Sequence, residues 1–184
     1  IVVTGCLAER YKDEILKEMP EVDAVCGVGS FSDIVDIVKR TLEGEHVTRY
    51  GDIDAPEQET GRVLTTSPLW EYIKIAEGCD NRCAYCIIPY LRGRFRSRRV
   101  EDIVSEAQLL AENGIRELIV VAQDVTRYGL DIYGERALAG LLKSLAEIQG
   151  IEWIRLHYLY PDEIDDELID VIAGEPKILK YLDI

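Results

Sequence analysis

Apolar and polar positions follow each other along residues 1–50 with the periods expected for buried strands and amphipathic helices. Short apolar runs at residues 1–3 and 22–26 predict two buried strands. The segment between them, residues 7–18, predicts a helix that Pro20 ends, because proline cannot continue a helical hydrogen-bond pattern. The apolar face of this helix comprises Leu7, Tyr11, Ile15 and Leu16.

A second helix is predicted after the second strand. Ser30 or Ser32 stands where a side chain caps a helix, and Gly44 is typical of a helix end. The predicted apolar face of this helix comprises Ile34, Val35, Val38 and Leu42. The β-α-β-α order predicts part of an open α/β sheet over residues 1–50, with Cys26 as a core residue of the second strand.

Residues 51–68 interrupt this pattern with glycine, proline and acidic residues, and we interpret them as a linker. Strands and helices alternate again over residues 69–184. The predicted strands are residues 72–76, 117–122, 152–156 and 178–184; the predicted helices are residues 100–113, 138–148 and 164–173. This alternation predicts an α/β fold with a parallel sheet or barrel, and four strands are too few to close a barrel.

The predicted helix at residues 100–113 is amphipathic and has signals for both of its ends. Ser97 is placed to cap it, and the Asn113-Gly114 pair is placed to end it. Its apolar stripe comprises Val100, Ile103, Val104, Ala107, Leu110 and Ala111.

The charge distribution narrows the class of partner. The 184 residues carry a net charge of −14, which disfavours broad binding to nucleic acid. Residues 61–100 differ, with 8 basic and 3 acidic side chains. Within them lies an arginine run formed by Arg92, Arg94, Arg96, Arg98 and Arg99. Such a run is either a solvated face or a surface that steers an acidic group of a substrate.

No apolar run approaches the ~20 residues that a membrane helix needs. No basic-flanked apolar leader opens the sequence, so we expect a cytoplasmic protein without membrane contact. The chain begins with Ile1 and ends in a strand-like run. We therefore expect a fragment of a longer protein, cut at both ends and inactive alone.

Three cysteines, Cys79, Cys83 and Cys86, form a C-x₃-C-x₂-C pattern directly after a predicted strand. Three thiolates within eight residues are the ligands of an iron–sulfur cluster, of zinc or of copper(I). Structural zinc sites have four ligands, and no fourth cysteine or histidine lies in this loop. The alternatives are a non-catalytic zinc site completed by a distant ligand, or three thiols without a metal.

The run AEGCDNRCAYCIIP at residues 76–89, followed by the arginine run, resembles the methylthiotransferase branch of the radical S-adenosylmethionine (SAM) superfamily. The resemblance implies that Cys79, Cys83 and Cys86 hold a 4Fe–4S cluster that binds SAM. It also implies that the reduced cluster cleaves SAM to a 5′-deoxyadenosyl radical, which abstracts hydrogen from an unreactive C–H bond. Residues 4–8 resemble the last cysteine motif of the family's N-terminal domain, so Cys6 is implied as one of three ligands of an auxiliary 4Fe–4S cluster.

The resemblance also suggests residues that contact SAM. Tyr85 is implied to pack on its adenine; a loop or core tyrosine is the alternative. Gln123 and Asp124 end a strand at the edge where barrels place ligands, and we expect them to contact SAM or substrate, with simple turn chemistry as the alternative. Arg155 and His157 share one face of a later strand. We expect Arg155 to bind SAM, whereas for His157 a core position and a ligand role stay open.

The runs at residues 122–134 and 153–162 resemble the branch that methylthiolates the β-carbon of an aspartate in a small-subunit ribosomal protein. The branch that modifies a tRNA adenosine has asparagine where this chain has Asp124. We therefore expect a basic ribosomal protein as substrate, with tRNA as the alternative. The resemblance implies two 4Fe–4S clusters, SAM and an electron donor such as flavodoxin or ferredoxin. It divides the chain into a partial N-terminal domain at residues 1–50, a linker at 51–68 and a partial radical SAM barrel at 69–184.

Overall fold

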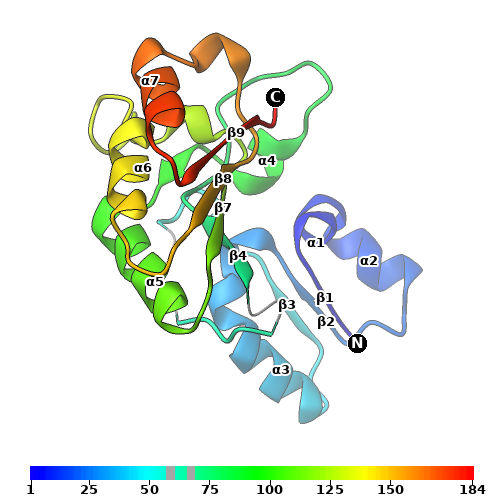
Figure 1. The fold of residues 1–184 in the computed structure, drawn as a ribbon. Helices are drawn as coiled ribbons and strands as arrows, with labels where there is room; N and C mark the ends of the chain where they lie inside the picture. The colour runs from blue at the N-terminus through cyan, green and yellow to red at the C-terminus, as the bar shows by residue number, and fades with distance from the viewer. Residues whose placement is uncertain (57–60, 66–68) are drawn as a thin grey trace. The chain divides into compact units, whose positions relative to one another are not determined.

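The computed structural model describes residues 1–56, 61–65 and 69–184 (Figure 1). The chain divides into two compact units. One combines Ile1–Gln58 with Cys79–Arg94, and the other combines Glu59–Gly78 with Phe95–Ile184. The predicted linker falls partly on residues 57–60 and 66–68, outside the described residues, and the division at residues 50 and 69 stays a prediction.

The first unit contains a three-stranded parallel sheet. Its strands are β1 (Val2–Thr4), β2 (Ala24–Cys26) and β3 (Val47–Arg49), which pair in that order. The first two strands confirm the predicted runs. The third was not predicted, because its three residues are too short and too polar to show an alternating pattern.

The predicted continuous helix over residues 7–18 is wrong. The chain forms two short helices, α1 (Cys6–Tyr11) and α2 (Asp13–Glu18), separated by Lys12. Lys12 has a φ of 40°, a backbone conformation that cannot continue a right-handed helix. At this break its ammonium group pairs with Glu9 at 3.2 Å and lies 5.1 Å from the centre of the Tyr50 ring.

The next helix, α3 (Ile34–Leu42), differs from its prediction at both the cap and the face. Neither serine caps it: Asp33 is the N-cap residue, and Ser30 lies inside a 3-10 helix, Val28–Asp33, that precedes α3. The buried residue of α3 is Ile37, whereas Leu42 is 83% exposed. Ile34 and Ile37 pack against Ala24, Cys26 and Val47, so the helix is rotated from the predicted face. Cys26 is fully buried in this core, as predicted.

The second unit contains a four-stranded parallel sheet, which confirms the predicted α/β class. Its strands, in spatial order, are β4 (Trp70–Lys74), β7 (Glu117–Val121), β8 (Trp153–Leu156) and β9 (Ile178–Leu182). Three helices lie along one side of this sheet (Figure 1): α5 (Val100–Glu112), α6 (Leu138–Ala146) and α7 (Asp166–Gly174). This arrangement is that of an incomplete (β/α) barrel.

The core of the second unit lies between the sheet and these helices. The apolar stripe of α5 is confirmed, since Ile103, Ala107 and Leu110 are buried in the core. The predicted cap of α5 is wrong, because Arg99 is its N-cap residue and forms no side-chain cap. Ser97 belongs to strand β6 (Arg96–Ser97), where its hydroxyl accepts a hydrogen bond from the Gly129 amide at 3.0 Å.

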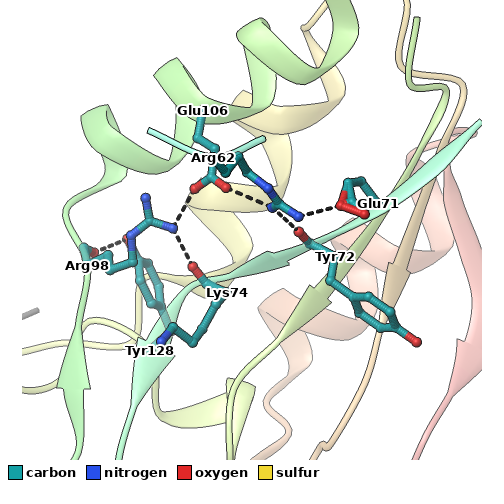
Figure 2. A network of polar contacts seen from close by, with 7 residues as sticks. All are labelled: Arg62, Glu71, Tyr72, Lys74, Arg98, Glu106 and Tyr128. Carbon is teal, nitrogen blue, oxygen red and sulfur yellow. Dashed lines mark hydrogen bonds and ion pairs between the residues drawn. The ribbon is translucent and has the colours of Figure 1, made fainter. Parts of the chain in front are cut away.

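A polar network joins residues before β4 to helix α5 within this unit (Figure 2). The Arg62 guanidinium donates to the Tyr72 carbonyl at 2.7 Å and to Glu106 at 3.0 Å, and it also pairs with the buried carboxylate of Glu71. The guanidinium of Arg98 pairs with the other oxygen of Glu106 at 2.7 Å.

Within the described part of the chain, no helix is both long and apolar enough to span a membrane.

Candidate active site

The three clustered cysteines lie on a loop whose two ends are held together. The flanking strands β5 (Ala76–Glu77) and β6 pair antiparallel. Inside this pair, the Cys79 amide donates to the Gly93 carbonyl at 3.2 Å. The chain turns at each end of the loop through a glycine with positive φ, 78° at Gly78 and 74° at Gly93. Other residue types rarely adopt this backbone conformation.

A buried carboxylate stands at the start of this loop. Glu77 is 5% exposed; one of its oxygens accepts from the Gly78 amide at 3.1 Å, and the other pairs with the Lys74 ammonium at 3.0 Å. The Glu77 side chain thus fixes the backbone directly before Cys79. Glu77 was not predicted as a site residue, although a carboxylate between apolar strand residues and a glycine is a visible signal.

The cysteine side chains differ in exposure. Cys79 is buried, whereas Cys83 and Cys86 are half-buried and are joined by a turn in which the Cys86 amide donates to the Cys83 carbonyl at 3.0 Å. None of the chain's five cysteines, all of which are described, forms a disulfide bond. Tyr85, between them, is 93% exposed.

The structure places the three thiols on one loop without gathering them. Among the described residues, no group of three His, Cys, Asp or Glu side chains is arranged to hold a metal ion. The donor set itself fits an iron–sulfur cluster, because it offers three thiolates within eight residues of one loop. The ligand role of Cys79, Cys83 and Cys86 therefore stays a prediction, and so does the role of Tyr85.

Cys6 lies at the carboxyl end of β1, where the chain turns through Gly5 with a φ of 94° and enters α1. The carboxyl ends of parallel strands are the edge at which α/β sheets bind ligands. The Arg92 side chain, from helix α4 (Ile88–Arg92) of the cysteine loop, donates its Nε–H to the Cys6 sulfur at 3.2 Å. Cys6 is thus a half-buried thiol with a cationic donor beside it.

A cavity of about 330 Å³ opens at the carboxyl edge of the second sheet. Residues that follow three neighbouring strands line it: Gln123 and Asp124 after β7, Tyr158, Leu159 and Tyr160 after β8, and Asp183 and Ile184 after β9. Tyr158 has a φ of 64°, and non-glycine residues in this conformation concentrate at functional sites. The tyrosines and Asp183 were not predicted as site residues; their only signal was their position directly after predicted strands.

Gln123 and Asp124, the two predicted site residues that follow β7, differ in the hydrogen bonds of their side chains. Asp124 is 2% exposed, and its Oδ1 accepts from the amide of Thr126 at 3.1 Å and from the hydroxyl of the same residue. It therefore caps a 3-10 turn, Val125–Arg127, as the turn alternative anticipated. The Gln123 Oε1 atom, in contrast, is buried and has no hydrogen-bond partner among the described residues. Because buried polar atoms are normally satisfied, Gln123 is the stronger candidate for a ligand contact.

Arg155 lies on β8 opposite Ile119 of β7. Its Nε donates to the Glu117 carboxylate at 2.7 Å, and its guanidinium lies 5.8 Å from the centre of the Tyr181 ring. The predicted contact of Arg155 with SAM stays a prediction. His157 is half-buried with its ring edge-on to the Tyr158 ring at 5.9 Å, which leaves both of its alternatives open.

Comparison with known proteins identifies the class. The model of the radical SAM superfamily matches residues 73–184, and the chain belongs to this family. A protein of Clostridium tetani named ribosomal protein uS12 methylthiotransferase RimO is 51% identical over 185 aligned residues, which cover 100% of this chain. A protein of the same name from Lachnoclostridium phytofermentans is also 51% identical over 100% of the chain.

The chain spans 42% of the length of each of these relatives. Among solved structures, the radical S-adenosylmethionine methyltransferase TsrM from Kitasatospora setae aligns over 58% of this chain and 20% of its own, with 22% identity and a TM-score of 0.45. The predicted family is confirmed, and its barrel segment coincides with the four-stranded parallel sheet.

Proposed function

We propose that this chain is part of a radical SAM methylthiotransferase that adds a methylthio group to the β-carbon of an aspartate in a small-subunit ribosomal protein. The observation that carries the proposal is the three-cysteine loop within a chain that is 51% identical, over its whole length, to proteins named uS12 methylthiotransferases. We also propose that the chain comprises two functional domains, residues 1–50 and 69–184, joined by a linker at residues 51–68.

Cys79, Cys83 and Cys86 would hold one 4Fe–4S cluster, and Cys6 would be one ligand of a second. Cys26, the only other cysteine, is buried in the core of the first unit, so further ligands of the second cluster would come from outside this chain. When bound, the clusters supply the electron that cleaves SAM to a radical and the sulfur that is transferred. The residues of the chain orient these groups and exclude water from them.

The cavity at the carboxyl edge of the second sheet would bind SAM. Gln123 would donate or accept a hydrogen bond at the polar end of the ligand, and Asp124 would shape the turn beside it. Arg155, which is not among the residues that line this cavity, would pair with the carboxylate of SAM, since a guanidinium keeps donors for a second partner while Nε bonds Glu117. Independently of this cavity, we propose that Tyr85, whose ring is exposed on the three-cysteine loop, is an adenine contact.

The net charge of −14 supports a basic protein as substrate rather than tRNA. The proposed substrate is the ribosomal protein that the names of the relatives specify. A ribosomal substrate implies that the enzyme works in the cytoplasm. A low-potential protein such as flavodoxin or ferredoxin would deliver the electron.

The class of reaction is tested with the full-length protein, reconstituted anaerobically with iron and sulfide. Dithionite and SAM should yield 5′-deoxyadenosine, and Cys83→Ala should abolish this product. Cys26→Ala is the matched control, because it removes a thiol that lies in the core, and it should retain the product. One zinc per chain and no 5′-deoxyadenosine would instead identify a non-catalytic zinc module.

The substrate is tested by mass spectrometry on strains that lack the gene. The proposal requires that, in these strains, one peptide of the small-subunit protein loses the mass that a methylthio group adds, with the tRNA unchanged. Loss of the methylthio group from a tRNA adenosine, with the ribosomal protein intact, would assign the enzyme to the tRNA branch.

A further inference from the structure

The contact between Arg92 and Cys6 connects two parts of the chain that are 86 residues apart. Arg92 ends α4, within the loop that carries Cys79, Cys83 and Cys86, and Cys6 begins α1. Helices α1 and α4 pack against each other in the first unit. One side chain of the three-cysteine loop therefore contacts the sulfur of the cysteine proposed for the second cluster.

The backbone around Arg92 is held on its C-terminal side by two further hydrogen bonds. The Gly93 carbonyl accepts from the Cys79 amide at 3.2 Å, and the Arg94 amide donates to Asp54 Oδ1 at 2.7 Å. These bonds fix the end of α4 within the first unit. The backbone from which the Arg92 side chain extends is thus held by hydrogen bonds, and its Nε donates to the Cys6 sulfur from there.

A donor in this position acts on the charge of the sulfur. A thiolate bound to a metal remains electron-rich, and a hydrogen bond from a cation stabilises that charge. The stabilisation is larger after the metal centre takes up an electron, because the centre is then more negative. Hydrogen bonds to ligand sulfurs accordingly raise the reduction potential of iron–sulfur clusters.

We infer that Arg92 is a positioning residue for the Cys6 sulfur: its Nε–H orients the sulfur and raises the reduction potential of the cluster that Cys6 is proposed to bind. The inference rests on the proposed function, which assigns Cys6 to the auxiliary cluster. It assigns Arg92 a role toward the second cluster, although Arg92 belongs to the loop of the first.

The test uses the full-length protein with Cys79→Ala, Cys83→Ala and Cys86→Ala, so that only the auxiliary cluster forms. In this background Arg92→Gln removes the cationic donor, and Arg92→Lys keeps the charge but changes the geometry. Arg10→Gln is the matched control, because it removes the same charge from α1, where Arg10 is exposed and its guanidinium lies over the Tyr11 ring. The readouts are iron content and the midpoint potential from a redox titration followed by electron paramagnetic resonance.

We expect Arg92→Gln to make the auxiliary cluster about tenfold harder to reduce, a decrease of about 59 mV for one electron. Arg92→Lys should lie between Arg92→Gln and the parent, and Arg10→Gln should match the parent. A cluster that forms in all variants with one common potential overturns the inference and leaves the proposed function standing. A parent background that binds no iron overturns the assignment of Cys6 and the inference with it.

A second measurement tests the inference without Arg92→Gln. The parent for this measurement, the triple-alanine protein that keeps Arg92, is produced with ¹⁵N-labelled arginine, and its reduced auxiliary cluster is probed by pulsed electron paramagnetic resonance. We expect a weak coupling to an arginine ¹⁵N nucleus that disappears in Arg92→Lys. Absence of any arginine coupling in the parent overturns the inference, even if Arg92→Gln fails to fold.

Discussion

Arg98 and Glu106 form an ion pair, Nη1 to Oε2 2.7 Å, that ties the residue after β6 to the middle of α5 (Figure 2). Both side chains are largely buried, with exposed fractions of 9% and 20%. The same Arg98 nitrogen donates to the Lys74 carbonyl at 2.6 Å. Because Arg62 bonds the other carboxylate oxygen, Glu106 compensates two guanidinium charges at once.

Glu106→Gln should lower the free energy of unfolding by about 2–3 kcal/mol, because it removes the carboxylate charge that pairs with the largely buried Arg98 guanidinium and with Arg62. The measurement is urea unfolding followed by circular dichroism. Glu112→Gln, on the exposed face of the same helix, is the control and should change stability by less than about 0.5 kcal/mol. Equal effects of the two substitutions would show that the network contributes nothing specific.

Burial raises the pKa of Tyr128, whose hydroxyl donates to the Arg98 carbonyl at 2.8 Å. Below about pH 10, the ordinary pKa of tyrosine, the hydroxyl is neutral in both the folded and the unfolded state. Above that pH the unfolded state loses the proton while the folded state keeps it, so the free energy of unfolding should fall as the pH rises. Tyr128→Phe should flatten this fall between pH 9 and 11 in urea-unfolding series. A decline as steep in Tyr128→Phe as in the parent protein would rule out Tyr128 as its source.

Gly129 and Gly134 both have a positive φ, 92° and 77°, but their surroundings differ. A Cβ atom at Gly129 would lie 2.5 Å from the Ala137 Cβ and 3.0 Å from the Ala137 amide nitrogen, whereas one at Gly134 would meet open space. Gly134→Ala should cost about 1–2 kcal/mol of backbone strain alone. Gly129→Ala should cost clearly more, because steric overlap adds to the same strain. Thermal denaturation of the two variants tests this order, which a lower melting temperature for Gly134→Ala would reverse.

Gln123 and Asp124 should separate ligand binding from folding. Gln123→Ala should weaken SAM binding by about tenfold, or about 1.4 kcal/mol, with little change in stability, because its buried oxygen bonds no described residue. Asp124→Ala should lower stability by about 1 kcal/mol, because the turn loses its cap. Equilibrium dialysis with labelled SAM and thermal denaturation measure the two effects. Unchanged SAM binding in Gln123→Ala would remove this residue from the proposed site.

Arg155 is tested against its partner Glu117. Arg155→Lys should weaken SAM binding, because one ammonium group cannot serve both Glu117 and a ligand carboxylate in the geometry of a guanidinium. Glu117→Gln keeps the arginine and should retain SAM affinity within about twofold, a difference of about 0.4 kcal/mol. The same dialysis measures both variants. Equal affinities of the parent and Arg155→Lys would leave Arg155 with only its contact to Glu117.

The alternation of strands and helices was predictable in the second unit, because the apolar pattern of each main element repeats over enough residues to indicate a strand or a helix. Helix α5 shows this best, since its stripe is repeated over three turns. The first unit was harder, because its strands have three residues each. Two errors of prediction fall at residues with contacts distant in the sequence. Lys12, at the helix break, contacts Tyr50, and Ile37, on the buried face of α3, packs with Val47. A local sequence pattern does not contain such contacts.

The candidate site was predictable in its chemistry and less so in its geometry. The spacing of Cys79, Cys83 and Cys86 indicates a metal donor set, and the family match agrees with the resemblance. The bond from Arg92 to Cys6 has no sequence signal, because it joins residues 86 positions apart. The separate roles of Gln123 and Asp124 also appear only in the hydrogen bonds of the folded chain.

The hydrogen bonds that join the two ends of the cysteine loop have a consequence for the uptake and loss of iron. The pairing of β5 with β6 and the hydrogen bond from the Cys79 amide to the Gly93 carbonyl bring the ends of the loop together through backbone groups, without using a thiol. The entropy of closing the loop is therefore spent during folding, and a cluster has only to draw in the short stretch between Cys79 and Cys86. Zinc fingers differ, because metal binding and folding are one event there. A chelator that strips iron from this protein would accordingly leave its two sheets folded and ready for reloading.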